Sequence, residues 1–134
     1  AFDFIEHIPR VLISPELITR FLFIEFMNEV WRVLKPGGIF YAVTPAYPMP
    51  EAFQDPTHVN IITDQTHHYF CRDWSYTSNY GFKGRFEIVA AKWVHPRVAL
   101  NAIDSPKKAY RNFVKTYLRG QRKTHFLWQL RAVK

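Results

Sequence analysis

The sequence has a single cysteine, Cys71, and only five glycines. Because one cysteine cannot pair within the chain, there is no disulfide partner, and a reducing, cytoplasmic compartment is expected. No apolar run reaches the length that a membrane-spanning helix requires, so no membrane span is expected. The glycines form no G-x-G-x-x-G turn of the kind that holds the phosphates of a nucleotide cofactor.

Acidic residues are absent from residues 107–134, although the whole chain contains eleven and has a formal net charge of +7. The basic residues of this block are Lys107, Lys108, Arg111, Lys115, Arg119, Arg122, Lys123, Arg131 and Lys134. Unopposed cations are suited to bind nucleic acid, an anionic glycan, lipid head groups or an acidic protein surface. The alternative is a solvated helix face without a partner.

The 134 residues are 48% hydrophobic and 17% aromatic, which is enough for one hydrophobic core. The segment Leu34–Tyr41, LKPGGIFY, predicts the end of a helix at a proline and two glycines, followed by a buried strand. The apolar run Ile39–Val43 is typical of an interior parallel strand. Upstream, Ser14–Glu16 combines a capping oxygen, a proline and an acid, which predicts a helix start with an apolar stripe to Leu34 and a break near Phe21.

Later segments predict further elements. A loop is expected at 46–62, a short helix at 63–70, a strand at 81–94, a helix at 107–118 and a strand at 124–133. The side chains expected to face inward from the last helix are Tyr110, Phe113, Val114 and Tyr117. Those expected on one face of the last strand are Phe126, Trp128, Leu130 and Ala132.

Together, Phe4–Pro9, FIEHIP, and Leu34–Tyr41 resemble the second half of the class I S-adenosylmethionine-dependent methyltransferases, where a Glu-His pair follows the fourth strand and LKPGG introduces the fifth. The resemblance implies an α/β fold. It would be the C-terminal part of a Rossmann-like sheet, with parallel strands, a terminal antiparallel hairpin and helices on the faces. The last strand would lie between the fifth and sixth. Because the glycine-rich turn is missing, residues 1–134 would be a single partial domain without the N-terminal half.

The resemblance also implies an activity, the transfer of a methyl group from S-adenosylmethionine to an oxygen or nitrogen acceptor. Phe2 and Asp3 would contact this cofactor largely through backbone atoms. The isolated fragment should be inactive, because its cofactor site is incomplete. The acceptor would be a small molecule, a glycan or a nucleic acid. Aromatic residues suited to line its site, or equally to pack in the core, are Tyr47, Phe53, Tyr69 and Trp74.

A metal site is expected where Asp3, Glu6 and His7 follow one another at the spacing of a helical turn. In the ubiquinone O-methyltransferases and small-RNA 2′-O-methyltransferases that this resembles, an acid-x-x-Glu-His pattern helps to bind a divalent metal beside the acceptor. Carboxylates with imidazole suit Mg²⁺, Mn²⁺ or Fe²⁺. The candidate ligands, of Mg²⁺ or Mn²⁺ above all, are Asp3, Glu6, His7 and His58.

His7 and His58 are also the candidate catalytic residues, because imidazole can take a proton from the acceptor. We expect Glu6, His7 and His58 to meet at one centre. The alternative is that Glu6 caps a helix dipole and the histidines are structural. In that case the chain would be a noncatalytic α/β module that binds nucleic acid or an anionic glycan through its basic C-terminal block.

Overall fold

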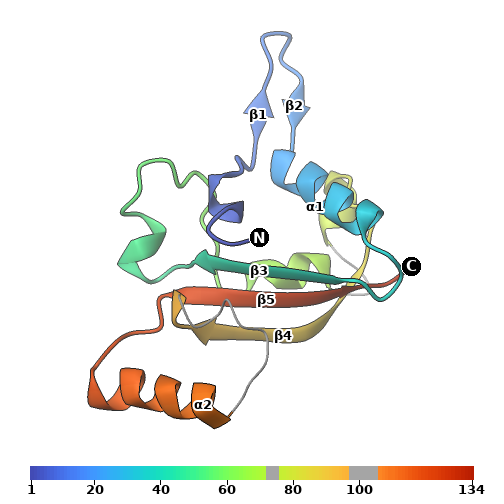
Figure 1. Cartoon of the computed structure of the whole chain (residues 1–134). Helices are drawn as coiled ribbons and strands as arrows, with labels where there is room; N and C mark the ends of the chain where they lie inside the picture. The colour runs from blue at the N-terminus through green and yellow to red at the C-terminus, as the bar shows by residue number, and fades with distance from the viewer. Residues whose placement is uncertain (72–75, 97–105) are drawn as a thin grey trace.

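A computed structural model of the protein describes residues 1–71, 76–96 and 106–134. The main sheet has three antiparallel strands in the order β3 (Ile39–Pro45), β5 (His125–Ala132) and β4 (Phe86–Val94). A small hairpin of β1 (Leu12–Ile13) and β2 (Thr19–Arg20) projects from the body of the molecule (Figure 1).

Two helices lie on opposite sides of the main sheet (Figure 1). Helix α1 (Leu22–Val33) covers one face, and α2 (Pro106–Phe113) continues into the π-helical turn η6 (Val114–Leu118) on the other side. Short 3-10 turns complete the described elements: η1 (Ile5–His7), η2 (Pro50–Ala52), η3 (Thr66–Phe70) and η4 (Tyr76–Tyr80). None of the helices in the described part of the chain has the length and apolar character needed to cross a membrane.

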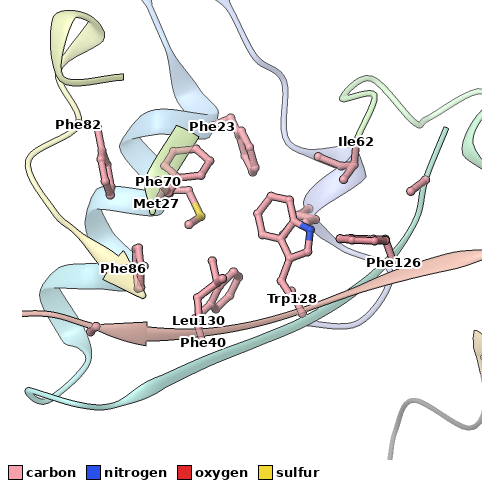
Figure 2. Packing of buried hydrophobic residues seen from close by; sticks show 14 residues of the cluster. Phe23, Met27, Phe40, Ile62, Phe70, Phe82, Phe86, Phe126, Trp128 and Leu130 are labelled. Carbon is pink, nitrogen blue, oxygen red and sulfur yellow. The ribbon is translucent and has the colours of Figure 1, made fainter. Parts of the chain in front are cut away.

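The core lies between α1 and the sheet, where aromatic side chains dominate (Figure 2). Trp128 is 0% exposed, and its ring lies 6.4 Å from that of Phe23 on α1. Met27 of the same helix is also 0% exposed. Each such side chain contributes roughly 1.5–3 kcal/mol when it leaves water. The predicted inward face of the last strand is confirmed, since Phe126, Trp128, Leu130 and Ala132 are all buried.

The expected Rossmann-like sheet with parallel strands is wrong. Within the described residues the strands of both sheets pair only in antiparallel fashion. Parallel pairing is limited to isolated bridges, Phe2 with Val43 and Tyr47 with Thr63. The reason at the N-terminus is local: Asp3 has a φ of 45°, and the chain turns into η1 after a single bridge. Strand β5 does lie between β3 and β4, as expected for the last strand.

The apolar run of β3 has a cause other than parallel pairing. Phe40 and Ala42 enter the main core, whereas Val43 packs with Leu127 on the opposite face. An antiparallel strand that is covered on both faces therefore has the same continuous apolar sequence. The joint that precedes it is as predicted: Gly37 has a φ of 74° and donates its N–H to the Ala132 carbonyl (2.9 Å).

Two of the three predicted helices differ from the structure in an informative way. Ser14–Glu16 does not start a helix; it lies in the β1–β2 turn, where the Leu17 N–H donates to the Ser14 carbonyl (2.9 Å). Helix α1 begins at Leu22, close to the predicted break. On α2 and η6, three of the four side chains expected to face inward point outward instead, with Tyr110 70%, Phe113 51% and Tyr117 74% exposed, and only Val114 is half-buried.

Candidate metal site

Turn η1 carries two predicted ligands, Glu6 and His7. It is held by the hydrophobic core on one side and by the loop that contains Asn60 on the other. Ile5 is 1% exposed and anchors the turn in the core. The Asn60 side chain donates to the Ile5 carbonyl (3.0 Å), and the Asn60 backbone N–H donates to the Glu6 carbonyl (2.9 Å). Because these bonds attach the loop to η1, His58 on that loop is brought beside Glu6.

Glu6 is a buried carboxylate with one oxygen left unsatisfied. Its side chain is 1% exposed, and Oε2 accepts a hydrogen bond from the Thr44 hydroxyl (2.7 Å). Oε1 is buried, has no hydrogen-bond partner among the described residues and lies 4.0 Å from His7 Nε2. A buried polar atom without a partner costs about 1–3 kcal/mol. This oxygen is therefore the strongest sign of a ligand at the site.

The hydrogen bonds around His7 assign its protonated nitrogen. Thr57 donates both its hydroxyl (2.7 Å) and its N–H (2.8 Å) to Asp55 Oδ1, and these bonds keep the pKa of Asp55 below its usual value. The Thr57 hydroxyl oxygen is then an acceptor for His7 Nδ1 (3.0 Å), as is the Thr57 carbonyl (3.2 Å). His7 thus carries a proton on Nδ1, and in the neutral ring the lone pair of Nε2 faces Glu6.

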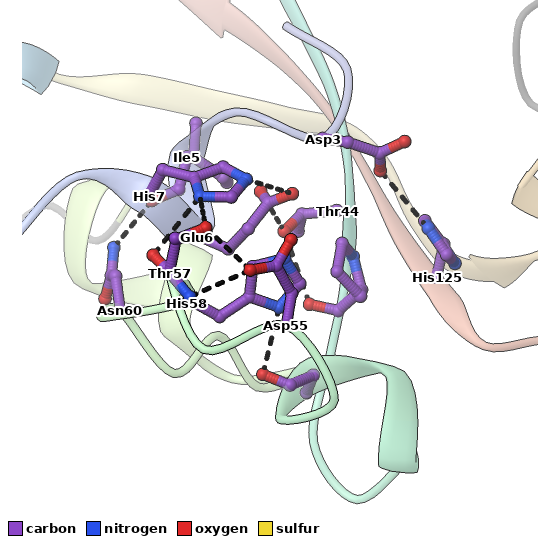
Figure 3. Close-up of polar contacts among 12 residues, drawn as sticks. Asp3, Ile5, Glu6, His7, Thr44, Asp55, Thr57, His58, Asn60 and His125 are labelled. Carbon is purple, nitrogen blue, oxygen red and sulfur yellow. Dashed lines mark hydrogen bonds and ion pairs between the residues drawn. The ribbon is translucent and has the colours of Figure 1, made fainter.

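His58 is held in the same tautomer. Its Nδ1 lies 3.2 Å from the Ala52 carbonyl, which can only accept, so Nδ1 carries a proton and in the neutral ring the lone pair is on Nε2. The His58 ring meets that of His7 nearly edge-on, with 4.8 Å between centroids. One ligand atom from each of Glu6, His7 and His58 lies within 4.8 Å of the other two, as Figure 3 shows for their side chains. The expected meeting of these three residues is confirmed.

The electrostatics of this cluster favour a cation. With both rings neutral, a carboxylate oxygen and two imidazole lone pairs converge, and Asp55 Oδ2 adds negative charge 3.9 Å from His58 Nε2. Lone pairs that face one another repel. A positive ion between them removes this repulsion and satisfies Glu6 Oε1, and hydrogen-bonded imidazoles of fixed tautomer are typical of metal ligands.

Asp3 does not join the cluster, so the structure does not place it as a ligand. Its Oδ1 lies 3.2 Å from His125 Nε2, and this pair is set to one side of Glu6 and His7 (Figure 3). Burial lowers the pKa of His125, while the nearby carboxylates, Asp3 first, oppose that shift. Sequence reasoning missed His125, because only the strand register places it opposite Pro45 at this end of the sheet.

The other predicted residues are dispersed. Phe2 is 46% exposed, forms an isolated bridge to Val43 and places its ring 5.8 Å from that of Tyr41, away from the cluster. Tyr47 and Phe53 form an exposed T-shaped pair, 6.2 Å between centroids, and Phe53 directly follows the Ala52 carbonyl that orients His58.

Two of the expected aromatic residues do not lie with this pair. Tyr69 lines a separate apolar cavity of about 650 Å³ together with Phe21 and Tyr80. Trp74 lies outside the described residues. The aromatic wall expected around the acceptor is therefore reduced to Tyr47 and Phe53 as its candidates.

Comparison with known proteins identifies no relative: no protein-family model, curated protein or solved structure matches this chain. A functional assignment therefore depends on the geometry of the Glu6, His7 and His58 cluster and on the resemblance of the two short sequence segments.

Proposed function

We propose that the chain forms the acceptor side of a metal-assisted, S-adenosylmethionine-dependent methyltransferase acting on an oxygen or nitrogen acceptor. The observation that carries the proposal is Glu6 Oε1, a buried oxygen that has no hydrogen-bond partner among the described residues and faces His7 Nε2 in a cluster completed by His58. The reaction class comes from the resemblance of the Glu-His and LKPGG segments to the class I methyltransferases. S-adenosylmethionine provides the electrophilic methyl group, and the proposal assigns its glycine-rich turn to sequence outside these residues.

The donor set favours Mn²⁺ or Fe²⁺ over Mg²⁺. Mg²⁺ prefers oxygen ligands, whereas two imidazoles with one carboxylate suit the later divalent ions. Because Asp3 is paired with His125, the site has one carboxylate ligand instead of the two that the sequence predicted. A divalent ion held by Glu6, His7 and His58 would polarise an acceptor hydroxyl and lower its pKa.

The residues of the chain itself have two tasks in this reaction. Asp55 and Thr57 orient His7, and the Ala52 carbonyl orients His58, so both Nε2 atoms are fixed before any ligand arrives. His58 Nε2 is suited either to bind the ion or to take the proton from the acceptor hydroxyl. Methyl transfer gains most from such alignment, because the sulfonium is already a strong electrophile.

The direct test is Mn²⁺ binding to the chain, followed by electron paramagnetic resonance. We expect one saturable site in the wild type, weakened at least tenfold in Glu6→Gln and in His58→Ala. His68→Ala is the matched control, because His68 lies outside the cluster and should bind as the wild type does. Equal binding by all four proteins, or no binding by the wild type, would contradict the metal site.

The activity is tested in the full-length gene product with radiolabelled S-adenosylmethionine. His58→Ala should lower turnover by about 10²-fold while cofactor affinity stays nearly unchanged. A chelator separates the two roles: a metal ligand loses activity that Mn²⁺ restores, and a pure base does not respond. The alternative, a noncatalytic module, predicts neither methyl transfer nor a glycine-rich turn in the upstream coding sequence.

A further inference from the structure

Helix α2 and turn η6 present an exposed apolar face. Tyr110, Phe113 and Tyr117 recur at positions i, i+3 and i+7, which lie on one side of a helix. These side chains are 70%, 51% and 74% exposed, and the next residue, Leu118, is 70% exposed. The rings of Phe113 and Tyr117 contact each other, with 5.0 Å between centroids. A contiguous apolar patch of this kind marks an interaction surface more often than single exposed residues do.

Cations flank this face without any acidic counterpart. Lys107, Arg111 and Arg119 are exposed on the same helical segment, and Arg122 and Lys123 follow it directly. Within the part of the chain that the structure describes, none of these five forms an ion pair. No aspartate or glutamate occurs from residue 107 to the C-terminal Lys134. The surface is therefore apolar in one sector and purely positive in the next.

We propose that this helix binds the surface of a membrane that contains anionic lipids. Its apolar face would enter the boundary between head groups and acyl chains, and its cations would contact lipid phosphates. The segment, about 20 Å long, would lie in the plane of the membrane. Tyrosine suits this depth, because its ring is apolar and its hydroxyl stays hydrated. The inference is independent of the proposed methyl transfer.

Nucleic acid fits the same face less well. Binding of single strands uses ring faces on which separate bases stack, interleaved with cations. Here the Phe113 and Tyr117 rings contact each other rather than alternating with cations, and Leu118 offers no surface for stacking. The segregation of apolar and charged residues into neighbouring sectors is instead the pattern of an interfacial helix.

Cosedimentation of the chain with vesicles tests the proposal. The chain should partition onto phosphatidylcholine vesicles that contain phosphatidylglycerol, and not onto phosphatidylcholine alone, with weaker partitioning at high salt. Lys107→Gln combined with Arg111→Gln should weaken partitioning about 25-fold, at about fivefold for each cation. The combination Lys35→Gln and Lys83→Gln removes the same charge from exposed sites elsewhere and should change partitioning far less.

A second set of variants tests the apolar face. Tyr110→Ser combined with Phe113→Ser should weaken partitioning at least tenfold at unchanged net charge. Leu17→Ser and Ile18→Ser, at the exposed β1–β2 turn, are the control for nonspecific apolar contact and should have no effect. No partitioning by the wild type, or equal partitioning by the serine variants of the helix, would overturn the proposal. Tighter binding to single-stranded RNA than to anionic vesicles would overturn it in favour of nucleic acid.

Discussion

Replacing Glu6 by glutamine should stabilise the metal-free protein. Among the described residues the wild type leaves Oε1 buried without a hydrogen-bond partner, at a cost of about 1–3 kcal/mol. Glutamine keeps an oxygen that accepts from the Thr44 hydroxyl, and it puts an N–H donor where Oε1 faces the lone pair of His7 Nε2. We expect a gain of about 1–2 kcal/mol, which raises the unfolding midpoint of a chain of this length by about 4–7 °C.

The same substitution should abolish the response to manganese. An ion that binds only the folded state stabilises it by about 2.7 kcal/mol at a hundredfold excess over Kd, or about 10 °C here. The wild type should therefore show this rise when Mn²⁺ replaces a chelator, and Glu6→Gln should not. Thermal unfolding followed by circular dichroism measures both effects. In chelator Glu6→Gln should have the higher unfolding midpoint, whereas adding Mn²⁺ should raise the midpoint of the wild type alone.

Two outcomes would refute this reasoning. If Glu6→Gln unfolds at a lower temperature than the wild type in chelator, the carboxylate already has a stabilising partner, and Oε1 is not an unsatisfied metal ligand. If Mn²⁺ shifts both proteins equally, it binds elsewhere. Glu29→Gln is the control, because Glu29 is 62% exposed in a surface ion pair with Arg32 and should change stability by less than about 0.5 kcal/mol.

Three further predictions concern the cofactor, pH and packing. The 134-residue chain alone should bind S-adenosylmethionine too weakly for calorimetry, and micromolar affinity would contradict the assignment of the cofactor turn to other sequence. Burial lowers the pKa of His67 to about 4. Between about pH 7 and pH 4 this imidazole therefore becomes protonated in the unfolded chain but not in the folded one. The free energy of unfolding should fall by about 3 kcal/mol over this range. Urea unfolding across this range should show a smaller loss in His67→Phe than in the wild type. Gly84→Ala should destabilise the protein by about 1–3 kcal/mol, because a Cβ there would lie 2.5 Å from the Trp31 ring; an unchanged urea midpoint would contradict this packing.

The sequence predicted elements best where a local pattern and the tertiary environment agree. The alternation from Phe126 to Ala132 predicted β5 and its buried face, because one side of the strand packs on α1. At Ser14–Glu16 the helix-start pattern was misleading, since serine and proline are equally suited to the hairpin turn that forms there. The continuous apolar run of β3 could not distinguish parallel from antiparallel pairing, because it reports only that both faces are covered.

The candidate site was predicted in part. Glu6, His7 and His58 were expected to meet where the loops after two neighbouring strands converge, and the structure brings them together. The predicted ligands also included Asp3, which a positive φ and His125 place elsewhere. The bonds that orient His7 and satisfy Glu6 Oε2 join residues 50 and 38 positions apart, so no local sequence pattern could have indicated them.

The position of β5 between β3 and β4 has a consequence for how the protein is made. Ile39 of β3 and Phe86 of β4 find their partners, Arg131 and Ala132, only in the last strand. During synthesis neither strand can join the main sheet until residues 125–132 have left the ribosome. Until then the apolar edges and α1 remain exposed to other nascent chains. The main sheet should therefore form only once β5 is available, and the protein should depend on chaperones until then.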